Sequence, residues 1–200
     1  MHWRLRDPGL SAGRALAGRY RQEHRRYHTL EHLADALGAV GQLQDAAQRA
    51  AGARPVDRGA VLLAACYHDA VYDISAADNE ERSARLAERQ LAHLGACEQR
   101  ARRVGELVRA TAEHDSAGDV EAAWLCDADL LVLASDPARY RDYARRVRAE
   151  YGRFSDEQWR SGRAGALRGL LARPRLFARA GDEAERAARK NLTGELRSLT

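Results

Sequence analysis

The hydrophobic pattern singles out one stretch of the chain, A-V-L-L-A-A-C-Y from Ala60 to Tyr67, which is apolar all round when it is drawn as a helix. Such a helix is typical of a position enclosed by other elements on every side. We therefore predict that helix 57–69 is the most buried element. Elsewhere apolar and polar residues mix, as in the amphipathic stretch L-A-E-R-Q-L-A-H-L of residues 86–94.

The rest of the chain also favours helix. Alanine, leucine, arginine and glutamate dominate, β-branched residues are sparse, and there are four prolines in 200 residues. We predict an all-α protein with helices at about residues 10–25, 29–50, 57–69, 79–95, 97–114, 119–134, 137–151, 156–172 and 182–199. No linker divides the chain, so we predict a single domain over residues 1–200, with a metal-binding core at about 25–135 and additional C-terminal helices at about 137–199.

Three predicted helix starts carry capping signals. Asp136 precedes a proline, the arrangement of an N-cap with proline at the first helical position. Ser155 and Gln158 have the spacing of a capping box, and Asp78 and Glu81 resemble the same box.

Histidines and aspartates interrupt the apolar pattern at three places. His68-Asp69 closes the apolar helix, and Asp127 and Asp129 lie within L-C-D-A-D-L-L-V-L, residues 125–133. The third place is R-R-Y-H-T-L-E-H-L, residues 25–33, where two histidines four residues apart would share one helical face. Burying an ionised carboxylate is expensive unless a cation or several donors compensate it, and a divalent metal would do so.

These residues offer a ligand set for a divalent metal ion. His32, His68, Asp69 and Asp129 supply two imidazole nitrogens and two carboxylates, a mixture that suits zinc, iron, manganese or magnesium. We predict one ion, or two, at this set. Asp127 and Asp129 point to roughly opposite faces of a helix, so Asp127 either orients a ligand histidine from behind or forms a surface ion pair.

The order of these residues resembles the HD superfamily of metal-dependent phosphohydrolases. The resemblance extends to small bacterial HD-domain proteins whose pattern includes Y-H-x-x-x-H, H-D-x-x-Y-D, N-E-x-x-S and D-A-D-L, and it covers most of the chain. The matching stretches are residues 27–32, 68–73, 79–83 and 127–130, with weaker similarity in R-A-E-Y at 148–151 and N-L-T-G-E-L at 191–196. This resemblance implies a helical HD-type bundle around the metal.

The resemblance also implies roles for other polar residues. Cyclic-nucleotide phosphodiesterases, distant relatives within the superfamily, carry a Y-H-N-x-x-H stretch in which the second histidine binds metal and the first is a general acid. By that similarity His28 would protonate the leaving oxygen, with His114 as the alternative. Glu80 could act as a base or hold the water, and Arg25 could clamp a phosphate. Structural interpretations stay open for the last three: a helix C-terminus for His114, a helix start for Glu80 and a solvated face for Arg25.

The predicted function is a metal-dependent phosphohydrolase, a phosphomonoesterase or phosphodiesterase, acting on a small phosphate ester such as a nucleotide. The metal would polarise a phosphoryl oxygen and activate water for attack on phosphorus. The chain does not clearly reproduce the second ligand pair of the phosphodiesterases, so cyclic nucleotides do not follow as substrates.

Two alternatives stay open. One is an HD-type di-iron oxygenase, which needs further histidines where this chain offers His93 and His114, and the other is a non-catalytic sensor or partner-binding module stabilised by metal.

Composition bears on location and partners. No run approaches the roughly 18 apolar residues of a membrane span, and the first residues, M-H-W-R-L-R-D-P, lack a signal-peptide core. Three cysteines without a C-x-x-C pattern fit a reducing compartment, so we expect a cytoplasmic protein. Acidic residues are interspersed with the arginines behind the net charge of +4, so we expect a small-molecule phosphate substrate and neither a membrane nor a nucleic-acid partner.

Overall fold

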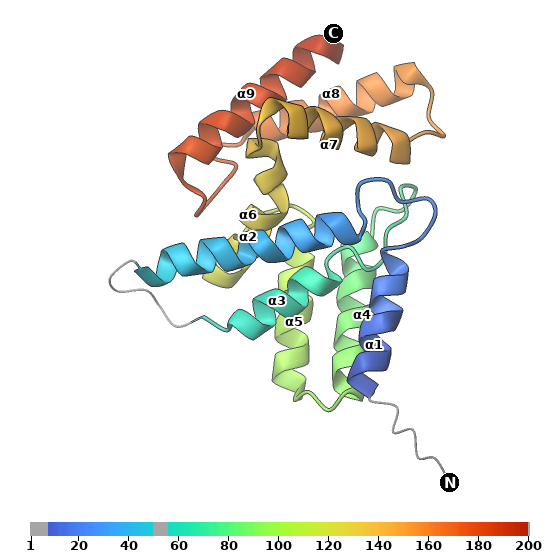
Figure 1. The fold of residues 1–200 in the computed structure, drawn as a ribbon, viewed down its shortest axis with the longest axis vertical. Helices are drawn as coiled ribbons and strands as arrows, with labels where there is room; N and C mark the ends of the chain where they lie inside the picture. Colours follow the sequence, from blue (N-terminus) through green and yellow to red (C-terminus); the bar gives the residue numbers. More distant parts are fainter. Residues whose placement is uncertain (1–7, 50–55, 200) are drawn as a thin grey trace.

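The structure, a computed structural model, describes residues 8–49 and 56–199 (Figure 1). The described residues form α-helices and one 3-10 helix without any strand, which confirms the all-α class. In chain order the elements are α1 (Pro8–Arg19), α2 (Leu30–Arg49), α3 (Arg58–Tyr67), α4 (Asn79–His93), α5 (Glu98–Ala110), α6 (Val120–Leu130), η1 (Leu131–Ala134), α7 (Pro137–Glu150), α8 (Asp156–Ala172) and α9 (Gly181–Leu199). Residue 50, the predicted end of the second helix, lies outside the described residues. None of the described helices combines the length and the apolar surface needed to cross a membrane.

Local capping explains where several helices begin. The Asp136 carboxylate accepts hydrogen bonds from two backbone N–H groups of α7, and Ser155 and Gln158 form the complete capping box of α8, both as predicted. The prediction for α4 was wrong, because the Asp78 side chain caps no backbone group. Glu81 pairs instead with two arginine side chains, since a guanidinium binds a carboxylate more strongly than a backbone N–H does.

The first helix ends earlier than its pattern predicts. Helix 10–25 was expected, but α1 ends at Arg19 and an irregular loop, residues 20–29, leads to α2. The guanidinium of Arg25 and the carboxylate of Glu150 bind backbone groups of this loop. Tertiary hydrogen bonds therefore override the local helix propensity. His28 accordingly lies in the turn before α2 and does not share a helical face with His32.

Two hydrophobic clusters fill the interior. The larger is built by α1 to α6 and the smaller by η1, α7, α8, α9 and the segment before α9, and Leu131 packs against both. Figure 1 shows α2 crossing between α7, α8 and α9 on one side and α1, α3, α4 and α5 on the other. The single-domain organisation stays a prediction.

The most buried helix is α6 and not α3, which corrects the prediction for helix 57–69. Every residue of α6 from Ala122 to Ala128 is buried. In α3 the buried residues share one broad face, while Leu62, Leu63 and Cys66 are half-buried. The greater burial of α6 follows from its position in the fold. This helix belongs to the larger hydrophobic cluster and leads directly into η1 of the smaller one, so residues of both clusters lie beside it. By contrast, α3 packs chiefly against α2, α4, α5 and α6.

Candidate metal centre

Four predicted ligands meet where three helices converge. His32 lies on the first turn of α2, His68 and Asp69 directly follow α3, and Asp129 lies on the last turn of α6. The Nε2 atoms of His32 and His68 are 3.1 Å apart. Asp69 Oδ2 lies 3.3 Å from His32 Nε2 and 3.1 Å from His68 Nε2, and Asp129 Oδ1 lies 3.1 and 3.4 Å from the same two nitrogens. We call these four side chains the ligand cluster.

Both histidines of the ligand cluster are buried, at 4 % and 1 % exposure. His68 Nδ1 is 2.8 Å from the carbonyl oxygen of Ala65, so this nitrogen carries a proton and donates it. In neutral His68 the Nε2 is then an acceptor, and it faces Nε2 of His32. Two such nitrogens come this close when a proton or a metal ion lies between them. His32, His68 and Asp129 could hold a metal ion, because each offers a ligand atom within 4.8 Å of the others.

Asp69 provides a test of whether a cation fits here. Its Oδ2 is buried and has no hydrogen-bond partner among the described residues. A buried carboxylate oxygen without a donor is unfavourable, and an adjacent cation removes the penalty. Ligand atoms about 2.0–2.1 Å from one ion are about 2.8–3.0 Å apart when adjacent in an octahedron and about 3.3–3.4 Å apart in a tetrahedron. The separations of 3.1 to 3.4 Å in the ligand cluster are compatible with either shell.

Charge balance within the ligand cluster also favours a cation. Burial opposes protonation of His32, but the adjacent carboxylates of Asp129 and Asp69 outweigh it and raise the pKa of His32 to about 9. Burial likewise opposes ionisation of the two aspartates, yet the charge of His68 holds the pKa of each carboxyl well below its usual range. The carboxylates therefore stay ionised and favour a positive charge, a proton or a metal ion, at the histidine nitrogens.

His114 orients the outer oxygen of Asp129. Its Nε2 is 2.8 Å from Asp129 Oδ2, while Oδ1 of the same carboxylate faces the ligand histidines. Because α5 ends at Ala110, His114 is not a helix residue, and its φ of +47° is strained for a residue other than glycine. Arg173 supports this turn by donating to the carbonyl oxygens of Glu113 and His114. The structure thus brings His114 to the ligand cluster, and its role as a general acid stays a prediction.

His28 borders the ligand cluster from the loop before α2. Its ring centre is 5.5 Å from that of His32, and its side chain is 22 % exposed. Nδ1 of His28 is 2.7 Å from Oε2 of Glu150, the last residue of α7. An ionised Glu150 selects the tautomer in which Nδ1 donates its proton to this carboxylate. Nε2 is then the ring nitrogen that remains available for proton exchange.

Glu150 is the site residue that sequence reasoning missed. Its side chain is fully buried, and Oε1 accepts hydrogen bonds from the backbone N–H groups of residues 26, 27 and 28 at 2.8 to 2.9 Å. Oε2 accepts a further hydrogen bond from the Tyr72 hydroxyl at 2.9 Å. One carboxylate therefore shapes the loop and orients His28. Glu150 lies in R-A-E-Y, but one glutamate in a charged helix gives no sign of a partner 122 residues away.

Glu150 is expected to make stability depend on pH in the acid range. Burial opposes its ionisation, but hydrogen bonds from His28 and from backbone N–H groups lower its pKa to about 2. The unfolded value is about 4.3. The ionised carboxylate therefore stabilises the folded state above about pH 4.3, and this contribution is lost as the pH falls toward 2.

Between about pH 5 and about pH 3 the folded state should lose roughly 1–2 kcal/mol of stability. Urea unfolding of the metal-free wild type and of Glu150→Gln at both pH values measures it, since the amide does not titrate. A stability difference between the two proteins that is the same at both pH values would contradict this expectation.

Arg25 is a structural residue and not the phosphate clamp that we predicted. The residue is 3 % exposed, and all five N–H donors of its guanidinium have partners within the protein. Nε and Nη2 donate to the side-chain oxygen of Gln22, Nη1 donates to the carbonyl oxygens of His28 and Asp69, and Nη2 also donates to that of Ala70. No donor is left for a substrate phosphate.

Arg25→Ala is expected to lower the free energy of unfolding by about 2–4 kcal/mol, because it leaves buried carbonyl oxygens without donors. Arg26→Ala is the matched control, since that side chain is exposed and binds only carbonyl oxygens of its own loop. Its loss should change the free energy of unfolding by less than about 0.5 kcal/mol. Urea titration followed by circular dichroism measures both. An unchanged stability with a raised KM in Arg25→Ala would favour the phosphate-clamp hypothesis instead.

Asp127 does not orient a ligand histidine, which corrects its predicted role. It is buried, and its carboxylate accepts hydrogen bonds from the backbone N–H groups of residues 178, 179 and 180 at 2.6 to 2.9 Å. Two residues turn a helix by about 200°, so Asp127 points away from the ligand cluster that Asp129 joins. Its burial and its amide partners also exclude the surface ion pair. Asp127 therefore ties the loop before α9 to α6.

Glu80 is half-buried on the first turn of α4. Within the described part of the chain it forms no hydrogen bond or ion pair with the ligand cluster. Its proposed action as a base stays a prediction.

A groove of about 660 Å³ borders the ligand cluster between α2, η1 and α9. His32, Asp129 and Tyr27 form part of its wall, and alanine supplies much of the rest. The other ionisable residues of the wall are Asp35, Asp136, Arg139 and Glu183. The arginine is paired with Asp35 at 2.6 Å. The groove therefore presents mainly hydrogen-bond acceptors beside the ligand cluster.

Comparisons of the chain with protein-family models, with curated proteins and with solved structures find no match. Membership of the HD superfamily is therefore a proposal, which the sequence motifs and the geometry of the ligand cluster support.

Proposed function

We propose that the protein is a metal-dependent phosphohydrolase of the HD type. The observation that carries the proposal is the meeting of two buried histidines and two aspartates, one with an oxygen that has no donor among the described residues. His32, His68, Asp69 and Asp129 would hold the ion. This ligand set suits zinc, iron, manganese or magnesium, and one ion satisfies it.

The protein side chains supply orientation and proton transfer. A bound divalent ion supplies Lewis-acid stabilisation of the phosphoryl group and a nucleophilic water at neutral pH. His28 would give the proton from Nε2 to the departing oxygen, because Glu150 holds its Nδ1 and the ring lies next to that of His32. His114 would keep the Asp129 carboxylate in its orientation through the 2.8 Å contact.

The ionisable residues in the wall of the groove beside the ligand cluster favour one class of substrate. The groove's carboxylate Glu183, which forms no ion pair with another described residue, favours a leaving group that carries hydroxyl or amino donors, as a nucleoside does. Its arginine is already paired with Asp35, so the phosphate would be held chiefly by the metal. A nucleotide, or another small phosphate ester with a donor-rich leaving group, fits both features.

The alternatives have less support. A di-iron oxygenase needs further histidine ligands, but His93 is exposed at the end of α4, and of the two histidines in that interval only His114 contacts the ligand cluster. A non-catalytic module leaves unexplained why a fully buried glutamate orients His28 beside the ligand cluster.

Metal analysis of the purified protein, followed by phosphatase and phosphodiesterase panels with Mn²⁺, Mg²⁺, Fe²⁺ or Zn²⁺, tests the proposal. We expect bound divalent metal and hydrolysis of at least one nucleotide, which a chelator stops. Iron-dependent oxygen consumption without phosphate release would favour the oxygenase. Bound metal without turnover of any substrate would favour the non-catalytic module.

We also propose a cytoplasmic location. Cys66, Cys97 and Cys126 are free thiols, which a reducing compartment maintains. The proposed partner is a small-molecule phosphate substrate, and fractionation of cells that express the tagged protein would test its location.

A further inference from the structure

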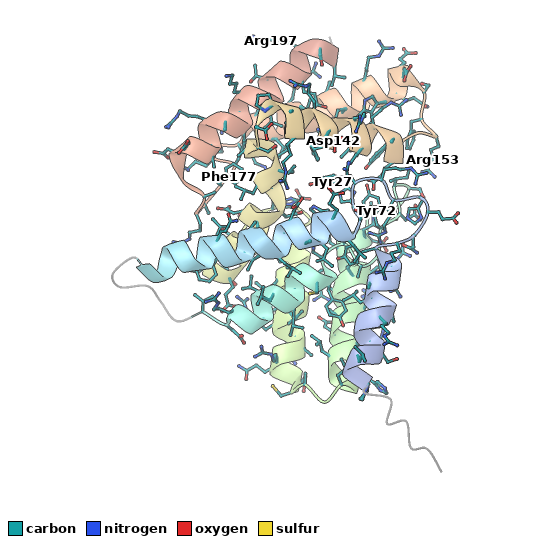
Figure 2. The ribbon with its side chains drawn as sticks, in the orientation of Figure 1. Tyr27, Tyr72, Asp142, Arg153, Phe177 and Arg197 are labelled. Carbon is teal, nitrogen blue, oxygen red and sulfur yellow. The ribbon has the colours of Figure 1, made fainter. Side chains whose placement is uncertain are left out.

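A second groove, of about 590 Å³, adjoins the His28–Glu150 pair. Tyr72 and Glu150 form part of its wall, and it shares no wall residue with the groove beside the ligand cluster. Its other polar wall residues are Arg19, Gln22, His24, Asp73, Arg82 and Arg153. Figure 2 shows Tyr72 and Arg153 at the same edge of the molecule, near the loops that follow α1 and α3. We call this the arginine groove.

The acceptors of the arginine groove are engaged by donors of the protein itself. Glu150 accepts from three backbone N–H groups, from Tyr72 and from His28. The Asp73 carboxylate accepts from the backbone N–H and the hydroxyl of Ser75. The side-chain oxygen of Gln22 accepts from the guanidinium of Arg25.

Its three arginines, in contrast, keep their donors available. Arg19 forms no side-chain hydrogen bond or ion pair with another described residue. Arg82 approaches a carboxylate only at 3.8 Å, at Asp78, and Arg153 lies over the ring of Phe154. They come from three separate elements: the end of α1, the first turn of α4 and the turn after α7. The charge of Asp73 interacts with those of Arg82 and Arg153, but no described carboxylate oxygen lies within 3.8 Å of the three guanidinium groups. Guanidinium groups that converge on one cavity without a close ion pair suit a phosphate anion.

We propose that the arginine groove is a second ligand site, separate from the metal centre, that binds a multiply charged phosphate compound of the diphosphate class. Three guanidinium groups against the two wall carboxylates, Asp73 and Glu150, leave the arginine groove with a net positive charge, and they offer a diphosphate planar, paired donors. Two wall residues of the groove contact the proposed general acid: the centre of the Tyr72 ring lies 4.2 Å from that of His28, and Glu150 binds Nδ1 of His28. This link to catalysis depends on the proposed function, whereas the binding site does not.

Calorimetric titration of inorganic pyrophosphate into metal-free Asp69→Ala protein tests the site, because this variant lacks a ligand of the proposed metal centre. At about 0.15 M salt we expect one equivalent to bind. The double variant Arg19→Ala/Arg153→Ala, made in the same background, should weaken binding at least about 10-fold. The matched control is Arg14→Ala/Arg141→Ala, two exposed arginines of α1 and α7 that do not line the groove, and its affinity should stay within about twofold.

Absence of pyrophosphate binding, or equal weakening in the two double variants, would overturn the site. The link to His28 has its own measurement: pyrophosphate should shift the imidazole nitrogen resonances of His28 in the Asp69→Ala protein and not in the Arg19→Ala/Arg153→Ala variant. Saturating binding without that shift would overturn the link. Neither measurement requires turnover, so a failure here is distinct from a failure of the proposed hydrolase activity.

Discussion

Replacing Asp69 with alanine is expected to abolish tight binding of a divalent cation, and with it every metal-dependent activity. The substitution removes the carboxylate oxygen that lies 3.3 and 3.1 Å from the two ligand imidazoles. The fold should persist, because Asp69 Oδ2 has no hydrogen-bond partner among the described residues and the backbone carbonyl that Arg25 binds is retained. Elemental analysis and calorimetric titration with Mn²⁺ or Zn²⁺ measure the loss. Added metal should raise the Tm of the wild type and not that of the variant.

Asp127→Asn is the matched control for this prediction. Asp127 is a buried carboxylate on the same helix as Asp129, but it binds the backbone of residues 178–180. Cation affinity should therefore change little, while the free energy of unfolding falls by about 1–3 kcal/mol. Tight binding retained by Asp69→Ala, or lost to the same extent in Asp127→Asn, would show that the ion is not held by the ligand cluster.

The two histidines at positions 28 and 32 should respond differently to replacement by alanine. His32→Ala removes an imidazole that faces His68 and both aspartates, so metal content and activity should fall together. His28→Ala should leave the metal content nearly unchanged and lower kcat by about 10²- to 10⁴-fold, the usual range for a general acid. Metal analysis and steady-state kinetics on each purified variant distinguish the two roles.

A leaving group that needs no proton provides the internal control. With a nitrophenyl phosphate the loss in His28→Ala should be smaller than with an alkyl ester, because nitrophenolate departs as an anion. The same loss on both substrates would argue against proton donation by His28. Equal metal loss in both alanine variants would make His28 a ligand, and the proton donor would then be sought at His114 or Glu80.

The sequence by itself determined the helical class, several helix ends and the residues of the ligand cluster. Asp136 and the Ser155–Gln158 box cap helices through partners no more than three residues away, so a short window contains the whole interaction. His68, Asp69 and Asp129 stood out because charge-capable side chains are rare in apolar segments without a compensating ion. These signals depend on local geometry and on the cost of burying charge, and both can be read along the chain.

Only the tertiary structure decided what the neighbouring polar residues do. Arg25 binds a carbonyl oxygen 44 residues away, Glu150 binds backbone N–H groups 122 to 124 residues away, and Asp127 binds a loop 51 to 53 residues away. No short window distinguishes an arginine that will be buried from one that stays solvated, or shows which backbone groups a distant carboxylate will meet. Those pairings arise when the two hydrophobic clusters pack and bring these segments together. A buried polar group then forms hydrogen bonds with the groups that the packing places beside it.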